Sequence, residues 1–505
     1  MCPELHLPSR NPYMPNDFGL RCESSPDLQD VPSGPRILLN NPGTRLWFKQ
    51  DNEFRLPKCN VNFNLISPIW PQDQVRDLLL QLFANLFDDS INEEAYQFSL
   101  AGLCFNITAN APTLRLNFSG YNHKMLVLVE NIVNRLVQFT RPDEERYAVL
   151  LKKMEMKMKN FTSFSPLDQA DGHCASVLFD RTCLHEERCA AVDEVDENFP
   201  FAEITYEELV EAIPSFFRRV FVETMVYGNV DVEEALKFNE TLTNALHQYA
   251  HWRSPVTMVS PHMREVEIPT GPPCIYKQIN RSNAISAILV YYQNLPITAE
   301  NCAIHRLFDQ LIREPAFNHL RTEKQLGYIV RAGWHMSNSF QGIHLVIQSK
   351  YHPRDLDEHI EEFKTLINMP MTEFNEHVES VIALLLEKPK KMGQQATRYW
   401  SQILRQRYDF DRFEREAEII RNTSKDHVLA FYNTHIKATS EARRKLAIYV
   451  IAEGATPMKK EEIGMEITNP TEFKRTQPLR PLTAPCILMD LKSSISPTPT
   501  ANRTF

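Results

Sequence analysis

The sequence lacks the short motifs and long apolar runs that would assign a common class at once. No GxSxG, GxxxxGK[ST] or GxGxxG pattern occurs, so serine hydrolase, P-loop and dinucleotide-binding chemistry have no motif to rest on. No run of about 18 apolar residues occurs, and the first residues, MCPELHLPSRNPYMP, carry neither an apolar core nor a basic leader. We expect a non-secreted protein with no membrane partner, located in the cytoplasm, with mitochondria or peroxisomes left open.

Cysteine pairs and basic arms are also missing. The ten cysteines form no CxxC pair, which favours reduced thiols over a disulfide framework in a chain of 505 residues. The net charge of -9 and the pI near 6.0 leave no general attraction to phosphate backbones, which argues against nucleic acid as a partner. Apolar residues make up 43% of the chain and charged residues 24%, so the chain can bury large cores.

The chain contains a two-copy repeat. One ungapped offset brings Leu82, Phe83, Leu86 and Gly102 opposite Leu307, Phe308, Leu311 and Gly327, and both 307 minus 82 and 327 minus 102 give 225. Each copy predicts a strand, two helices and a strand. The helices are expected at 74–87 and 91–102 in the first copy and at 302–312 and 316–326 in the second, ended by Gly102 and Gly327. A period of 225 residues indicates two domains rather than a solenoid.

The prolines and the repeat together predict the domain limits. Residues 1–42 hold eight prolines and are expected to form an extended linker, followed by a first domain at 43–254. A proline-rich linker at 255–273 then leads to a second domain at 274–492, and residues 493–505 are expected to be a disordered tail. The fold class is α+β, with two homologous domains that each pack helices on a largely antiparallel sheet.

No HxxEH or other complete zinc-peptidase motif appears among the sixteen histidines. The first-copy helix at 74–87 has neither His nor Glu. In the second copy, His305 and Asp309 lie one helical turn apart; they suit either two metal ligands or a partly solvated amphipathic face, and we favour the face. We therefore expect no metal on this chain.

Three other patterns have ligand-like spacing. His247 and His251 could chelate a metal but lack a general base between them, so a helix end with two surface histidines is the preferred interpretation. The segment CLHEERC offers Cys183, His185, Glu186 and Cys189, and we favour a structural role for it. The segment HIEEF offers His359 and Glu362 ahead of Phe363, and a solvated helix face explains it.

Several longer segments, in the right order, carry a resemblance to a known family. They are LWFKQDNEFRLPK from Leu46, FNHLRTEKQLGYIV from Phe317, EKPKK at 387–391 followed by Tyr399 and Trp400, and TEFKR at 471–475. From about Leu46 the chain resembles the C-terminal half of the insulin-degrading enzyme (insulysin) family of pitrilysin-type zinc peptidases. Nardilysin is the related alternative, although no long acidic insert is present.

The resemblance implies a shape and an activity. Members of that family have four homologous domains in two bowl-like halves, which close around peptides such as insulin or amyloid-β. By this resemblance the chain would be the third and fourth domains, half of a peptide-enclosing chamber, and the zinc with its HxxEH ligands would belong to the N-terminal half.

The resemblance also implies site residues. Arg321 and Tyr328 would face the zinc of the other half and support substrate binding or the transition state, with Phe317 and Asn318 beside them. Without the family, Arg321 is an exposed helix residue and Tyr328 an ordinary strand aromatic. Lys388, Lys390 and Lys391 would form an anion patch facing the chamber, or else a solvated helix end.

Two classes of function remain open. In the first, the chain is the substrate-chamber half of a metalloendopeptidase and is inactive alone. Its partners would be peptide substrates and an HxxEH-bearing half or a full-length homologue, and a homodimer is also compatible with the family. In the second, the chain is a non-enzymatic peptide-binding or regulatory partner of a full-length relative.

Overall fold

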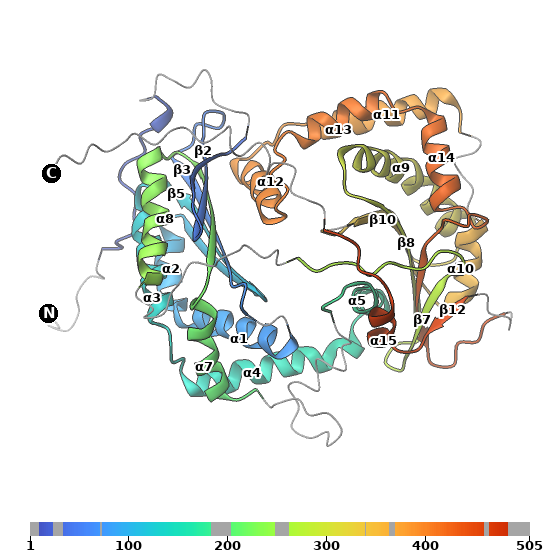
Figure 1. Cartoon of the computed structure of the whole chain (residues 1–505), viewed down its shortest axis with the longest axis horizontal. Helices are drawn as coiled ribbons and strands as arrows, with labels where there is room; N and C mark the ends of the chain where they lie inside the picture. The colour runs from blue at the N-terminus through green and yellow to red at the C-terminus, as the bar shows by residue number, and fades with distance from the viewer. Residues whose placement is uncertain are drawn as a thin grey trace, which may run out of the picture.

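The structure, a computed structural model, describes residues 10–23, 34–70, 73–182, 204–247, 262–338, 340–362, 369–458 and 464–482. Within these ranges the chain forms two six-stranded sheets, each covered by helices (Figure 1). The first sheet has the order β1-β2-β6-β3-β5-β4 and the second β12-β7-β11-β8-β10-β9. Both sheets are mostly antiparallel, with parallel pairs at β2–β6, β7–β11 and β7–β12.

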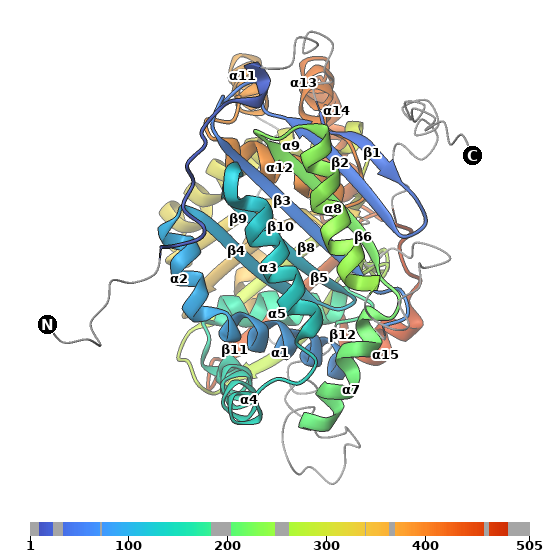
Figure 2. The same cartoon turned by 90° about the vertical axis from the view of Figure 1, so that its left-hand side faces the viewer.

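The first half of the chain builds the first sheet and the helices on its outer face (Figure 2). Its elements are β1 (Arg36–Asn40), β2 (Thr44–Gln50), β3 (Lys58–Ile66), α1 (Gln74–Ser90), α2 (Asn92–Leu100), β4 (Leu103–Asn110), β5 (Thr113–Tyr121), α3 (Met125–Gln138), α4 (Glu144–Lys159), α5 (Pro166–Leu178), α7 (Tyr206–Phe217), β6 (Phe221–Gly228) and α8 (Val232–His247), with short 3-10 turns at Arg21–Glu23, Asn122–Lys124 and Asn160–Ser163.

The second half builds the second sheet and its helices. Its elements are β7 (Cys274–Asn280), β8 (Ser286–Pro296), α9 (Ala299–Phe317), the π-helical turn η5 (Asn318–Glu323), β9 (Ile329–Met336), β10 (Phe340–Ser349), α10 (Pro353–Glu362), α11 (Met371–Leu386), α12 (Met392–Leu404), α13 (Arg412–Arg421), α14 (Lys425–His435), β11 (Lys445–Ala452), β12 (Met465–Ile467) and α15 (Pro470–Thr476).

Five strands of each sheet correspond, because β2-β6-β3-β5-β4 and β7-β11-β8-β10-β9 have the same chain order and the same parallel and antiparallel pairings. The sixth strands differ: β1 precedes β2 and pairs antiparallel with it, whereas β12 follows β11 and pairs parallel with β7. Helix α1 begins at residue 74 and α9 at residue 299, 225 residues later, and the paired leucines and phenylalanines of the repeat are buried in both helices. Capping side chains start both helices, Asp73 for α1 and Thr298 for α9. The predicted fold class is confirmed.

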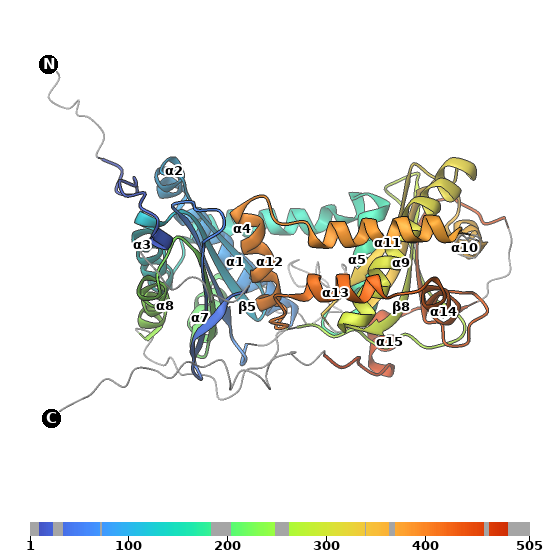
Figure 3. The same cartoon turned by 90° about the horizontal axis from the view of Figure 1, so that it is seen from above.

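Each half contributes one helix to the inner face of the other sheet. Helix α5, from the first half, packs its apolar side against β8 and β11 of the second sheet, through Leu167, Val177, Leu289 and Leu446 among others. Helix α12, from the second half, packs against β2 and β6 of the first sheet through contacts that include Trp47, Tyr227 and Tyr399. Figure 3 shows α4 and α11, the helices that precede them, crossing the space between the sheets.

A polar contact supports the α12 side of this exchange. Glu223 on β6 is fully buried and accepts hydrogen bonds from Trp47 Nε1 at 3.1 Å and from the hydroxyl of Tyr408 at 3.1 Å. The guanidinium of Arg45 lies 3.4 Å from the same carboxylate and donates to the Tyr408 hydroxyl at 2.7 Å. Burial raises the pKa of Glu223, and Arg45 opposes that rise. A carboxylate without these partners would be costly at this place.

The expected domain limits need three changes. Strand β1 lies inside the segment expected to be a linker at 1–42, where Tyr13 is also buried. Helix α5 lies inside 43–254 but packs on the second sheet. The linker expected at 255–273 is packed over its described part, because Glu265 and Val266 are fully buried and form β-bridges, Glu265 with Phe179 and Val266 with Leu479. The expected tail at 493–505 lies outside the described residues.

Candidate functional site

Three of the four predicted substrate residues meet at the edge of the second sheet. The guanidinium carbon of Arg321 lies 4.8 Å from the ring centroid of Phe317 and 4.7 Å from that of Tyr328. Tyr328 is 81% exposed and Phe317 is 38% exposed. Arg321 therefore lies against two aromatic rings, with attraction between the cation and each ring. Asn318 is exposed on the same turn and has no side-chain contact to these three among the described interactions.

The backbone that carries this group differs from the predicted one. The two expected helices at 302–312 and 316–326 are one continuous element, because α9 runs to Phe317 and passes directly into η5. The helical path ends after Glu323, and Gln325 takes the left-handed conformation with φ of 53°. Gly327 was expected to end the helix, and that expectation is wrong.

Gly327 is needed for a close approach instead. A Cβ at this position would lie 2.2 Å from the carbonyl oxygen of Gln348 on β10. Leu326 beside it accepts a hydrogen bond from the Ser349 hydroxyl and donates its N–H to Leu320 O at 3.0 Å. The chain is thereby held against β10 just before Tyr328, and Tyr328 leaves the sheet edge with its ring toward solvent and Arg321.

The other charged residues near this group are paired with one another, so the Arg321 guanidinium is its main cation. His319 and Glu323 pair with each other at 2.9 Å on the outer side of η5, and Lys324 lies 3.9 Å from Glu362. No ion pair is recorded for Arg321 within the described parts of the chain. An arginine stacked on two rings keeps its N–H edge for carbonyl or carboxylate oxygens, and the exposed phenol beside it can donate a hydrogen bond.

His305 and Asp309 are buried rather than partly solvated, so that expectation was wrong. Both nitrogens of the His305 ring have neighbours: Nδ1 lies 2.6 Å from Asn301 O and Nε2 lies 3.2 Å from the Asn294 amide. Burial lowers the pKa of His305 to about 4. Asp309 accepts from Trp334 N at 3.0 Å and pairs with Arg313 at 2.5 Å. These contacts hold α9 on β8 and β9 and leave no ring nitrogen of His305 for a metal.

The other ligand-like patterns give no metal site in the parts that can be seen. His247 Nδ1 lies 2.6 Å from Thr243 O at the exposed end of α8, while His251 lies outside the described residues. His359 lies 3.3 Å from Glu362 on a helix surface. Cys183, His185, Glu186, Cys189 and Phe363 also lie outside the described residues. Across the described ranges, no three His, Cys, Asp or Glu side chains are grouped to hold a metal ion.

Two of the three lysines expected to form an anion patch, Lys388 and Lys390, have carboxylates near them. Lys390 pairs with Glu387 at 2.8 Å. Lys388 borders a cleft of about 420 Å³ in which two further basic residues, Lys49 and Arg398, face five acidic ones, Glu53, Glu387, Asp409, Asp411 and Glu414. Lys391 uses its backbone N–H to bind Gln394 Oε1 at 3.2 Å. These surroundings weigh against an anion patch here, which stays a prediction.

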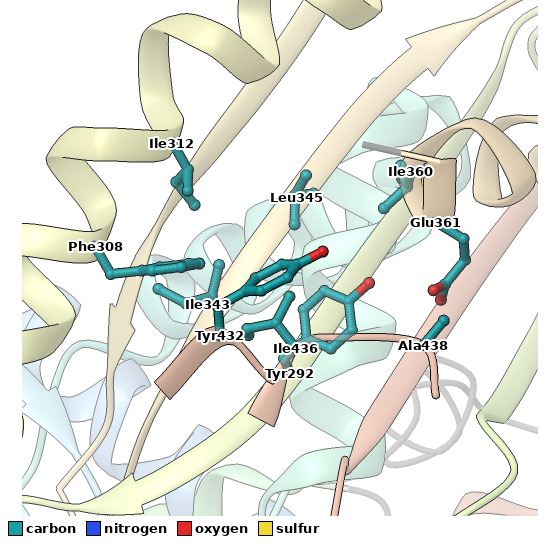
Figure 4. A pocket seen from close by; sticks show the side chains of 10 residues that line it. All are labelled: Tyr292, Phe308, Ile312, Ile343, Leu345, Ile360, Glu361, Tyr432, Ile436 and Ala438. Atoms are coloured by element: carbon teal, nitrogen blue, oxygen red, sulfur yellow. The ribbon is translucent and has the colours of Figure 1, made fainter. Parts of the chain in front are cut away.

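A small cavity of about 30 Å³ lies under α9, α10 and α14 on the second sheet (Figure 4). Its wall is mostly apolar, and the hydroxyls of Tyr292 and Tyr432 and the carboxylate of Glu361 lie toward one side of it. A cavity of this size has room for about one water molecule. It cannot receive a peptide, so the exposed group around Arg321 is the better candidate. No helix in the described ranges combines the length and the apolar content of a membrane span.

Two family profiles match separate parts of the chain. The profile described as "Middle or third domain of peptidase_M16" matches residues 1–191. A second profile, "PQQ synthase PqqF-like, C-terminal lobe domain 4", matches residues 307–400. The two matches follow the order of the two halves of the repeat.

Curated relatives match nearly the whole of this chain. The human insulin-degrading enzyme is 30% identical over 508 residues, which cover 96% of this chain and 48% of the relative. A nardilysin-like protein of Arabidopsis thaliana is 28% identical, over a match that covers 94% of this chain and 46% of the relative. The chain spans about half the length of the curated relatives it matches.

Solved structures agree on the fold. The crystal structure of pitrilysin superposes with a TM-score of 0.80 at 20% identity, covering 95% of this chain and 49% of pitrilysin. A peptidase M16 inactive domain from Pseudomonas fluorescens superposes over its full length and 84% of this chain, with a TM-score of 0.61 and 11% identity.

Proposed function

Because this chain belongs to the M16 peptidase family and is insulin-degrading-enzyme-like, we propose that it is the substrate-binding half of a two-half peptide chamber. In this role it contributes to the hydrolysis of peptides, with insulin-sized chains as the substrate class that its relatives' name suggests. The proposal includes a partner that carries HxxEH, either a separate N-terminal half or a full-length homologue. We place this activity in the cytoplasm.

The observation that carries the proposal is the exposed group of Arg321, Phe317 and Tyr328. The guanidinium, held between two rings, offers a planar pair of N–H donors to a peptide carbonyl or carboxylate. The phenol of Tyr328 is free of the sheet and can donate to the oxygen that becomes negative when a peptide bond is attacked. Asn318 and Phe317 border the same surface and would contact the peptide backbone.

The attacking water and its activation are assigned to the partner half. The described residues of this chain do not fit a zinc site, since His305 and Asp309 are committed to packing. A zinc ion with its HxxEH ligands on the partner would supply that chemistry. The role of this chain is to bind and orient the peptide and to donate a hydrogen bond in the transition state.

Reconstitution tests the proposal. The purified chain alone is expected to hold no stoichiometric zinc and to cleave no peptide, while addition of an HxxEH-bearing half from a relative should give peptide cleavage. Elemental analysis and a quenched fluorescent peptide measure the two properties. Peptide cleavage by the chain alone, with one zinc that survives mild chelation, would contradict the proposal. Peptide binding without cleavage in every reconstitution would favour the non-enzymatic alternative.

A further inference from the structure

Three arginine side chains converge on one neutral sulfur atom at the end of β9. Arg405, Arg407 and Arg412 each direct a guanidinium N–H at Met336 Sδ, over 3.5, 2.9 and 3.7 Å respectively. We call these three residues the arginine cluster. A thioether is a weak acceptor and carries no charge, so it does not balance three cations. Like charges this close together oppose one another unless an anion joins them.

The carboxylates recorded at the arginine cluster are too few to balance it. Glu416 is fully buried and accepts from Arg412 Nε, but it also binds Arg306 at 2.9 Å. Asp409 lies nearby and is paired with Arg415. Among the described residues, no carboxylate pairs with Arg405 or Arg407, and Arg407 instead donates to Ser337 O at 3.1 Å. The cluster therefore holds more positive charge than its paired neighbours neutralise.

Two buried N–H groups in the cluster have no acceptor within the described structure. Arg407 is 9% exposed and its Nε is unsatisfied, and Arg412 is 7% exposed and its Nη2 is unsatisfied. Buried polar groups of folded proteins nearly always have a partner, and each missing partner needs an explanation. An acceptor with several oxygens would satisfy both donors and the charge together.

The positive surroundings extend to the first sheet. Burial, together with the charges of Arg412 and Arg405, lowers the pKa of Arg407 to about 10. Arg115, half-buried on β5, also has an unsatisfied buried Nε. Burial lowers the pKa of His262 to about 4, and Arg115, Arg407 and Arg405 act in the same direction. Basic groups from both halves of the chain therefore surround the arginine cluster.

We propose that the arginine cluster binds a compact oxyanion of the phosphate or sulfate class beside Met336. A guanidinium presents paired N–H donors that match the oxygens of such an ion. The unbranched Met336 side chain can move aside without loss of backbone contacts. Since Arg407 and Arg412 are more than nine-tenths buried and Arg405 is exposed, the site suits a small ion that enters past Arg405 rather than a long acidic chain.

The bound ion would stabilise the junction between the two halves. Arg405 and Arg407 lie on the connection from α12 to α13, and Arg412 is the first residue of α13. The same connection carries Tyr408, the residue that contacts Arg45 and Glu223 on the first sheet. The proposal stands independently of the peptidase role, because it uses none of the residues assigned to peptide binding.

Thermal unfolding of the full chain in phosphate and in chloride at matched ionic strength tests the proposal. Phosphate should raise the melting temperature along a saturating curve by about 2–4 °C beyond chloride. Both the single variant Arg405→Gln and the double variant Arg405→Gln/Arg407→Gln should weaken the apparent affinity for phosphate at least about tenfold. Arg146→Gln is the matched control, because Arg146 lies on the surface of α4 and pairs with Asp89. General salting effects of phosphate are the same in every variant and cancel in this comparison.

Two further measurements complete the test. Met336→Leu should keep the phosphate response, because the sulfur is not needed once the anion is present. A tetraglutamate peptide with an acetylated N-terminus and an amidated C-terminus, added at the same concentration of negative charge as phosphate, should give no saturating rise in melting temperature. A response that is linear, or equal in wild type and in both arginine variants, would overturn the proposal. A stronger response to tetraglutamate than to phosphate would overturn it in favour of a peptide carboxylate. Circular dichroism verifies the fold of Arg405→Gln, whose side chain is exposed.

Discussion

The two copies of the repeat differ most where the long helix meets the edge strand. In the first copy α1 ends at Ser90, α2 follows, and Gly102 with φ of 73° leads into β4. In the second copy α9 continues through a π-helical turn, and the chain reaches β9 past Gly327. At the common offset of 225, Leu103 is fully buried and Tyr328 is 81% exposed. The same frame thus presents a packing residue in one copy and a surface group in the other.

The buried faces of the two helices differ as well. Leu80 and Ala84 of α1 stand at the offset of His305 and Asp309 in α9, and all four are buried. The second copy therefore places polar groups where the first has apolar ones, and it supplies them with hydrogen bonds from Trp334 and its neighbours. The two helices thus share apolar pairs such as Leu82 and Leu307 but differ in polarity at these two positions, where the buried polar groups of the second copy have hydrogen-bond partners.

The largest expected effect concerns the exposed group that the second copy alone presents. In the reconstituted enzyme, Tyr328→Phe should lower kcat by about a hundredfold, the usual cost of one oxyanion donor, with little change in KM. Arg321→Ala should also raise KM, since in the proposed role the guanidinium binds the peptide in the ground state. Steady-state cleavage of a fluorogenic peptide measures both.

Tyr96→Phe is the matched control for Tyr328→Phe. Tyr96 is 68% exposed on α2 and stands at the offset of Arg321 in the first copy. It should leave kcat and KM unchanged. If Tyr328→Phe behaves like Tyr96→Phe, the exposed ring of the second copy has no part in the reaction.

The two glycines should respond differently to substitution, because they serve different needs. Gly327→Ala should destabilise the chain by about 1–3 kcal/mol, since the new Cβ meets the Gln348 carbonyl and β9 must shift. A Cβ at Gly102 would lie 2.8 Å from the Tyr121 ring, so both substitutions there must displace that ring, but Gly102→Asn should cost less than Gly102→Ala because asparagine tolerates positive φ. Gly327→Asn should give no such relief. Urea unfolding measures each difference.

Gly393→Ala serves as the reference for the glycine pair. It lies in α12 with open space around its Cβ direction, so alanine there should stabilise by about 0.5–1 kcal/mol. Equal losses for Gly327→Ala and Gly327→Asn agree with a steric cause. A smaller loss for Gly327→Asn would show that the conformation of Gly327, rather than its contact with β10, is the constraint.

The repeat and the fold class could be predicted from sequence because both rest on local periodicity. Gly102 was correctly predicted to end its helix, since a left-handed residue after a helix is a local feature. The same rule failed at Gly327, because the close approach to Gln348 depends on strand pairing. The sequence also could not predict that α5 and α12 each pack on the sheet of the other half. An amphipathic pattern shows that a helix buries one face but not which sheet it covers.

The candidate site shows the same division. Arg321 and Tyr328 were predicted through resemblance, and local pattern alone would have left them as surface residues. The arginine cluster has no comparable sequence signal. Arg405, Arg407 and Arg412 are close in sequence, but the sulfur they share belongs to Met336 on a strand about seventy residues earlier. Only the folded chain brings these groups together.

The smallest expected effect concerns the polar core of α9, through the pH dependence of stability. The pKa of His305 falls to about 4 in the folded chain, because burial disfavours the charged ring, against 6.5 for an ordinary histidine. Between these values the unfolded chain binds a proton that the folded chain does not. Stability from the neutral ring is therefore present above pH 6.5 and is lost as the pH falls toward 4. For His305 alone the loss from pH 7 to pH 5 is about 1–2 kcal/mol.

His305→Leu, which installs the residue found at position 80 of the first copy, isolates this contribution. The difference in unfolding free energy between pH 7 and pH 5 should shrink by about 1–2 kcal/mol relative to wild type, whatever the variant loses at pH 7. His247→Leu, at the exposed end of α8, is the control for replacing a histidine by leucine outside this polar core. Both values come from urea unfolding at the two pH values. An unchanged difference in His305→Leu would mean that the ring is protonated in the folded chain at pH 5, and that the polar core of the second copy is open to water.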